Sequence, residues 1–190
     1  MKLGIIIGST RQGRTSGNYA KWIASAASNT DGVEVTVLDL RDYKLPMFDE
    51  AISPQYNPDR KPEGEVKKWL DTLAAQDAFV VVTPEYNRSI PGVLKNAFDH
   101  VAYELAKKPV AVATHGSSNG AQAVAHMRGI VPGMLAVTTP TFIGLPYMEM
   151  QNFSEDGTYT SDMAEMFSGL LGNVLAEVKW YGDALAAARK

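Results

Sequence analysis

Short apolar runs alternate along the chain with longer stretches in which apolar residues recur at helical spacing. The apolar runs are rich in Val, Ile, Leu and Ala and nearly continuous, which is typical of strands buried on both faces of a parallel sheet. They cover residues 2–8, 33–39, 78–83, 109–115 and 134–139. The stretches with helical spacing predict helices over residues 16–28, 64–75, 91–107, 119–130 and 161–188. This alternation predicts an α/β fold built around a mostly parallel sheet.

Composition narrows the function classes. The chain has 190 residues and 45% apolar content, which suits one sizeable core, so we expect a single domain over 1–190. The net charge is -3 with the signs interleaved, which argues against a nucleic-acid or anionic-membrane binder. No cysteine is present, so any redox chemistry must come from a bound cofactor. No apolar run reaches the ~18 residues of a membrane span, and we expect a soluble cytoplasmic protein.

The first candidate binding loop follows the first predicted strand, at residues 8–16 with the sequence GSTRQGRTS. Small residues, hydroxyls, two arginines and the N-terminus of the next helix all favour an anion. The loop lacks the Gly-Lys-Ser/Thr ending of nucleoside-triphosphate sites, and Thr10 stands where the dinucleotide fingerprint needs glycine. Asp39 therefore matches a ribose-binding acid only superficially. We expect a phosphate at this loop, with an ordinary strand-to-helix turn as the alternative.

A second candidate segment, TPEYNRSIPG at residues 83–92, follows the third predicted strand. Exposed backbone groups and an aromatic side chain at a strand end suit a flat heteroaromatic ligand. The alternative is a loop in which Tyr86 packs on a neighbouring element.

The fourth predicted strand ends in THGSSNG at residues 114–120, where two glycines allow close backbone approach. His115 could transfer a proton, but a lone histidine without an acidic partner is more often structural, which is the interpretation we favour. His100 and His126 lie on predicted helices, and we expect each of them to be structural or exposed. Residues 41–62 contain four prolines and no clean period, which predicts a surface loop that is either a lid or an irregular connection.

These residues resemble the NADPH-dependent FMN reductase family, which includes flavodoxin-like quinone reductases, azoreductases and chromate reductases. The resemblance covers most of the chain. It rests on GSTR at 8–11, LPMFDE at 45–50, and above all PEYN at 84–87 followed by IPGVLKNA at 90–97. It implies a flavodoxin-like three-layer sandwich with a five-stranded parallel sheet in the order 2-1-3-4-5.

The resemblance also implies which residues hold FMN without a covalent bond. The phosphate would lie among Ser9, Arg11, Arg14, Thr15 and Ser16. The ring would lie along Pro84, Glu85, Tyr86 and Asn87, with His115, Gly116 and Ser117 on its other side. Arg14 and Ser16 depart from the Ser and Asn that many family members carry there. No metal and no indispensable side-chain acid or base is expected.

The activity so implied passes a hydride from NADPH or NADH through FMN to a small-molecule acceptor such as a quinone, an azo compound, chromate or free flavin. The resemblance further implies a homodimer or homotetramer, for which the apolar helix carrying Val93, Leu94, Ala97, Phe98 and Val101 could supply the contact, although core packing explains that helix equally well. Three alternatives stay open: a flavodoxin-type electron carrier, a flavin reductase that supplies reduced FMN to a partner, and a regulator that senses NAD(P)H without turnover.

Overall fold

The computed structural model describes residues 1–189, and its strands form one parallel sheet in the order β2-β1-β3-β4-β5, with β6 paired to β4. The predicted order is therefore confirmed, and a sixth strand is added to it. The strands are β1 Lys2–Ile7, β2 Glu34–Asp39, β3 Ala78–Pro84, β4 Pro109–Gly116, β5 Val137–Thr138 and β6 Ile143–Pro146.

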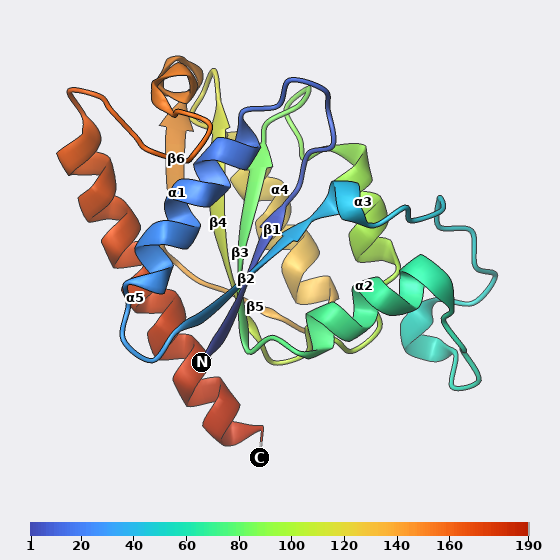
Figure 1. Ribbon diagram of the computed structural model, residues 1–190. Coiled ribbons are helices and arrows are strands. Elements are labelled where there is room, and N and C mark those ends of the chain that lie inside the picture. The colour runs from blue at the N-terminus through green and yellow to red at the C-terminus, as the bar shows by residue number, and fades with distance from the viewer. Residues whose placement is uncertain (190) are drawn as a thin grey trace.

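Helices cover both faces of the sheet and make three layers. Figure 1 shows α1 and α5 on one face and α2, α3 and α4 on the other. Their bounds are α1 Ser16–Ser28, α2 Gly64–Ala74, α3 Gly92–Asp99, α4 Ala121–Gly133 and α5 Ala164–Ala188. Short 3-10 turns occur at Leu40–Asp42, Pro54–Tyr56 and Tyr147–Asn152. Within residues 1–189, none of the helices combines the length and apolar character that a bilayer crossing requires.

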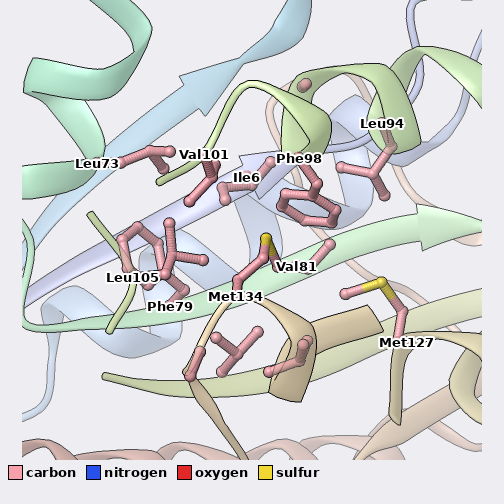
Figure 2. Close-up of a cluster of buried hydrophobic side chains, with 14 of the residues drawn as sticks. Ile6, Leu73, Phe79, Val81, Leu94, Phe98, Val101, Leu105, Met127 and Met134 are labelled. Carbon is pink, nitrogen blue, oxygen red and sulfur yellow. The ribbon is translucent and has the colours of Figure 1, made fainter. Parts of the chain in front are cut away.

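Alternation along the central strands sends successive side chains into two separate cores. On β1, Ile5 and Ile7 pack toward α1 and α5, while Ile6 packs toward α2, α3 and α4. Figure 2 shows the second of these cores, where Phe79 and Val81 of β3 meet Leu94 and Phe98 of α3. Burying each such side chain contributes about 1.5–3 kcal/mol, so both cores hold the sheet on which the site is built.

The edge of the sheet beside β4 is built from two short strands rather than the one predicted over 134–139. β5 pairs with the first residues of β4, and β6 pairs with its last four. Pro140 lies between them and has no N–H to donate, so the ladder is interrupted there. The chain then returns to the same edge as β6, which carries the polypeptide up to the carboxyl end of β4.

The helix predicted over 91–107 ends at Asp99. Beyond it, His100 Nε2 lies 3.0 Å from the Pro46 carbonyl oxygen, and Lys107 adopts a positive φ of 58°. Val101 and Leu105 continue into the core from turns rather than from a helix (Figure 2). The residues considered as a subunit contact are mainly in the core, since Leu94, Ala97 and Phe98 of α3 and Val101 beyond it are all buried.

The loop over 41–62 is tied to α3 rather than free to move as a lid. Arg60 Nε donates to Glu50 Oε2 at 2.7 Å, and Arg60 Nη1 donates to the His100 carbonyl at 2.9 Å. The hydrogen bond from Arg60 holds the pKa of Glu50 below its ordinary value. Asn96 of α3 bonds both the Pro46 carbonyl and the Phe48 N–H at 2.8 Å. The interpretation as an irregular connection is therefore the one that fits.

Candidate functional site

A cleft of about 270 Å³ opens where the carboxyl ends of β1, β3, β4 and β6 meet. Ligands bind at this edge of open parallel sheets because the strand-to-helix loops converge there. Most of the predicted cofactor residues line the cleft, namely Arg11, Arg14, Thr15, Ser16, Glu85, Tyr86, His115, Gly116 and Ser117. Residues distant in sequence are thus brought together as the resemblance implied.

Three predicted residues lie off the wall of the cleft. Ser9 is buried beneath it, Pro84 is buried as the last residue of β3, and Asn87 is exposed beside it. Two lining residues were not predicted, Gly13 and Tyr147. The available signal for Gly13 was its place inside the first candidate loop. In the structure its backbone has a positive φ of 70°. Tyr147 follows β6, and its place could not be predicted without that strand.

The N-terminus of α1 points its first turn at the cleft. Thr15 is the N-cap residue but makes no side-chain capping hydrogen bond, so its hydroxyl is available to a ligand. The first N–H groups of a helix lack intrahelical partners and carry the positive end of the helix dipole. Ser16 and Arg11 lie on the same wall. The arrangement suits a phosphate group.

The two arginines of the loop differ in what they contact. Arg14 forms an ion pair with Asp39, with Nη1 2.7 Å from Oδ1, and also donates to the Ser9 carbonyl. Burial alone would raise the pKa of Asp39, but hydrogen bonds from Arg14 and from the Arg41 N–H hold it below its ordinary value. Among residues 1–189, the Arg11 guanidinium has no ion-pair partner, and it lies 6.0 Å from the centroid of the Tyr86 ring. Arg11 is therefore the cation free to meet an anion.

Residues 86–89 form a tight hairpin at the end of β3. The Tyr86 N–H donates to the Ser89 carbonyl at 2.8 Å, and the Ser89 N–H returns a bond of 2.9 Å. Asn87 and Arg88 both have positive φ, 50° and 66°, as a type I′ turn requires. Tyr86 Oη lies 2.9 Å from Ser9 Oγ, and Ser89 Oγ lies 2.7 Å from His126 Nδ1. The hairpin thus fixes Tyr86 against the first loop.

Glu85 places its backbone, more than its carboxylate, at the cleft. Its side chain is only 5% exposed, and its Oε2 accepts a hydrogen bond of 3.0 Å from the Gln122 N–H at the start of α4. Ser118 Oγ donates to the other oxygen at 3.2 Å. A carboxylate at a helix N-terminus is stabilising. Glu85 therefore holds the 116–120 turn in place.

His115 joins the fourth strand to the first loop. Its ring is buried, its Nε2 lies 2.9 Å from Ser16 Oγ, and burial lowers its pKa to about 4. The imidazole is consequently neutral near pH 7 and bonds one cleft residue rather than an acid. The structural interpretation of His115 fits this geometry better than a proton-transfer role. No cluster of metal-ligating side chains occurs within residues 1–189.

Comparison with known proteins decides the family. Residues 1–147 match the family described as NADPH-dependent FMN reductase. The chain belongs to this family. The predictions of an oxidoreductase and of FMN with NAD(P)H as its cofactor and co-substrate are thereby confirmed.

Named relatives of this FMN reductase cover most of its length. A NAD(P)H-dependent FMN reductase of Schizosaccharomyces pombe is 32% identical over 142 residues, or 73% of this chain and 71% of the relative. An FMN-dependent NADPH-azoreductase of Staphylococcus haemolyticus is 28% identical over 165 residues, or 85% of this chain and 86% of the relative.

Solved structures agree on the fold of the FMN reductase. FerB, a flavoenzyme NAD(P)H:(acceptor) oxidoreductase from Paracoccus denitrificans, superposes with a TM-score of 0.74 at 23% identity, covering 95% of this chain and 98% of that one. A flavodoxin variant from Pseudomonas aeruginosa superposes with a TM-score of 0.59 at 18% identity, covering 94% and 99%. The predicted flavodoxin-like architecture is therefore confirmed.

The lining of the cleft suits FMN in its chemistry. Arg11 and the first turn of α1 make part of the lining cationic and dipolar. The same cleft also offers the aromatic ring of Tyr86 and the backbone of the turn that begins at Gly116. A molecule that carries both a phosphate and a flat ring matches these two kinds of lining.

Proposed function

We propose that this FMN reductase oxidises NADPH or NADH and passes the electrons through FMN to a quinone, with azo compounds, chromate or free flavin as related acceptors. The overall balance is NAD(P)H, a proton and a quinone giving NAD(P)⁺ and a hydroquinone. Residues 1–190 would act as one flavodoxin-like domain.

The observation that carries the proposal is that one cleft is lined both by groups that suit a phosphate and by groups that suit a flat ring. Arg11, Thr15 and Ser16 would surround the phosphate, with Arg11 as the charge partner. Arg14 would shape the loop through Asp39 and the Ser9 carbonyl instead of neutralising the phosphate. Tyr86 and the backbones of Glu85, Gly116 and Ser117 would border the ring.

The side chains of the cleft position and tune rather than exchange protons. When bound, FMN supplies the chemistry by accepting a hydride and releasing two electrons to the acceptor. Tyr86 would keep its place through Ser9, and His115 would hold Ser16 toward the phosphate as a neutral donor or acceptor. Backbone N–H groups at the turn over 116–120 would face the ring edge where negative charge develops. No general acid or base is needed among these residues.

An anaerobic stopped-flow experiment tests the proposal. The purified protein loaded with FMN is mixed with NADPH or NADH, and the visible absorbance of the oxidised flavin is followed. The reduced protein is then mixed with a quinone, an azo dye, chromate or free FMN. Rapid bleaching and rapid reoxidation by the quinone support the proposal.

Each alternative has its own result. An electron carrier would not be bleached by either nicotinamide. A flavin reductase serving a partner would reduce free FMN faster than the quinone and lose its own FMN on dilution. A sensor of NAD(P)H would bind no FMN at all.

We further propose a homodimer or homotetramer in the cytoplasm. Support for the contact comes from a groove of about 620 Å³ between α3 and α4, which borders Ser89 of the hairpin. Gly129 of α4 lines this groove and presents open space to a second copy, since a Cβ there would touch nothing. Sedimentation velocity on wild type and on Gly129→Trp tests this, and an unchanged oligomer in the variant would contradict it. The cytoplasmic location stays a prediction.

A further inference from the structure

Tyr147 is an aromatic residue on the cleft wall that the function described above leaves without a task. It is the first residue of the 3-10 turn Tyr147–Asn152 and is 62% exposed. Tyr86, on the same wall, is half-buried and bonded to Ser9. An exposed aromatic ring on the wall of a cleft offers its face to a planar ligand.

The strand register places the two tyrosines symmetrically. His115 of β4 pairs with Pro84 of β3 on one side and with Leu145 of β6 on the other. Tyr86 and Tyr147 each follow their paired residue by two positions, so both lie at the same level beyond the end of β4. β3 and β6 flank β4 on opposite sides, and both tyrosines line the same cleft as Gly116 and Ser117.

The backbone that carries Tyr147 is anchored. Met150 of the same turn is buried in the core. Glu149 Oε2 accepts hydrogen bonds from the Tyr159 hydroxyl at 2.5 Å and from Asn152 Nδ2 at 3.0 Å. The Tyr159 hydrogen bond holds the pKa of Glu149 below its ordinary value, so this carboxylate stays ionised near neutral pH. Tyr147 is thus presented on a fixed support.

Exposure separates the roles of the two rings. A resident cofactor can rest against a ring that is fixed and partly withdrawn from water, as Tyr86 is through its bond to Ser9. A substrate that enters and leaves at every turnover must meet residues at the open side of the cleft, where Tyr147 lies. Aromatic side chains bind flat conjugated rings by stacking.

We propose, building on the proposed function, that Tyr147 is the stacking wall for the flat conjugated ring of the exchanging substrate, either the nicotinamide of NAD(P)H or a quinone acceptor. It determines specificity for planar substrates and does not hold FMN. Met148, its neighbour, is exposed but does not line the cleft, and therefore serves as a matched control.

The test compares wild type with Tyr147→Phe, Tyr147→Ala and Met148→Ala, each loaded with FMN. Binding of 2-naphthol, which is planar and not reducible, is followed by the change in flavin absorbance without turnover. FMN affinity is measured by fluorescence titration of the apoprotein. Half-reactions with NADPH, a naphthoquinone and ferricyanide, an anion that offers no flat ring, separate the two substrate rings.

Tyr147→Ala should raise the 2-naphthol dissociation constant about tenfold, the worth of one aromatic contact. It should weaken apparent binding of NADPH, of the quinone, or of both by a similar factor, and the affected half-reaction identifies the ring. Tyr147→Phe and Met148→Ala should bind 2-naphthol within about twofold of wild type, because both keep the aromatic face of residue 147. In Tyr147→Ala, the rate of the ferricyanide reaction and the affinity for FMN should also stay within about twofold of wild type, because neither depends on that face.

Unchanged 2-naphthol affinity in Tyr147→Ala overturns the inference and leaves the proposed function standing. A loss of FMN affinity in that variant also overturns it, because the ring would then belong to the cofactor pocket. A wild-type protein that binds no FMN overturns the proposed function together with the inference.

Discussion

The two ends of β4 each carry a buried ionisable side chain, but they use it differently. At the amino end, Lys108 Nζ donates to the Leu73 and Ala74 carbonyls at 3.0 and 2.8 Å, and burial lowers its pKa to about 8. At the carboxyl end, burial lowers the pKa of His115 to about 4, and its partner is Ser16 on the cleft wall. Lys108 closes the end of α2, whereas His115 shapes a binding surface. One strand thus serves stability at one end and ligand binding at the other.

The largest expected effect is at the turn after His115. Gly120 has a positive φ of 71°, and a Cβ there would overlap the Thr114 hydroxyl. Gly120→Ala should lower the free energy of unfolding by about 4 kcal/mol, combining the left-handed strain with overpacking. Urea denaturation measures it. Gly172→Ala in α5, where a Cβ touches nothing, is the control and should be neutral or stabilising by about 0.5–1 kcal/mol.

His115 should make the protein sensitive to acid. Its pKa is about 4 when folded and near 6.5 when unfolded, so the unfolded state binds more protons between these values. Stability from this group is complete above pH 6.5 and falls as pH drops toward 4, by about 3 kcal/mol. Urea midpoints at pH 6.5 and pH 4.5 measure most of this change, and FMN should alter it because His115 lines the cleft.

His115→Gln keeps a hydrogen-bond partner for Ser16 and should remove most of the loss of stability between pH 6.5 and pH 4.5. His126→Gln, at an exposed histidine, is the control and should lose stability at acid pH as wild type does. An equal acid-induced loss of stability in His115→Gln and wild type would contradict the role given to His115.

Lys108 should give a smaller effect at alkaline pH that is independent of FMN. Its folded pKa lies below the unfolded value of 10.5, so stability rises as pH increases from about 8. The gain by pH 10 should be about 2 kcal/mol, below the full shift because pH 10 is still below the unfolded value of 10.5. Lys108→Met should lose this rise in urea titrations. A rise that changes with FMN would show that the two ends of β4 are coupled.

The sequence was sufficient for the central strands because they are continuous apolar runs buried on both faces. It was insufficient for the end of α3. Val101 and Leu105 keep helical spacing from Phe98, so the pattern predicts a longer helix, but both residues lie in turns. β6 was not predicted because it has only four residues, which is too short for a recognisable apolar run.

The motifs located the cleft but not the contacts within it. Nothing in the loop sequence distinguishes Arg11 from Arg14, because the difference depends on Asp39 reaching Arg14 from β2. The sequence likewise predicts Glu85 as a ring contact. The structure shows instead that its carboxylate accepts a hydrogen bond from the first turn of α4. Tyr147 was not predicted as a cleft residue because β6 was not predicted, and the register of β6 is what places Tyr147 at the cleft.

Titration of the apoprotein with FMN, followed by flavin fluorescence, tests the central claim most directly. Wild type should bind one FMN, and Arg11→Ala should weaken binding by about 2 kcal/mol, or roughly thirtyfold, through loss of the one unpaired cation of the loop. Gln12→Ala, at an exposed neighbour that does not line the cleft, should bind like wild type. Equal FMN affinity in wild type and Arg11→Ala, or no binding in wild type, would contradict the account.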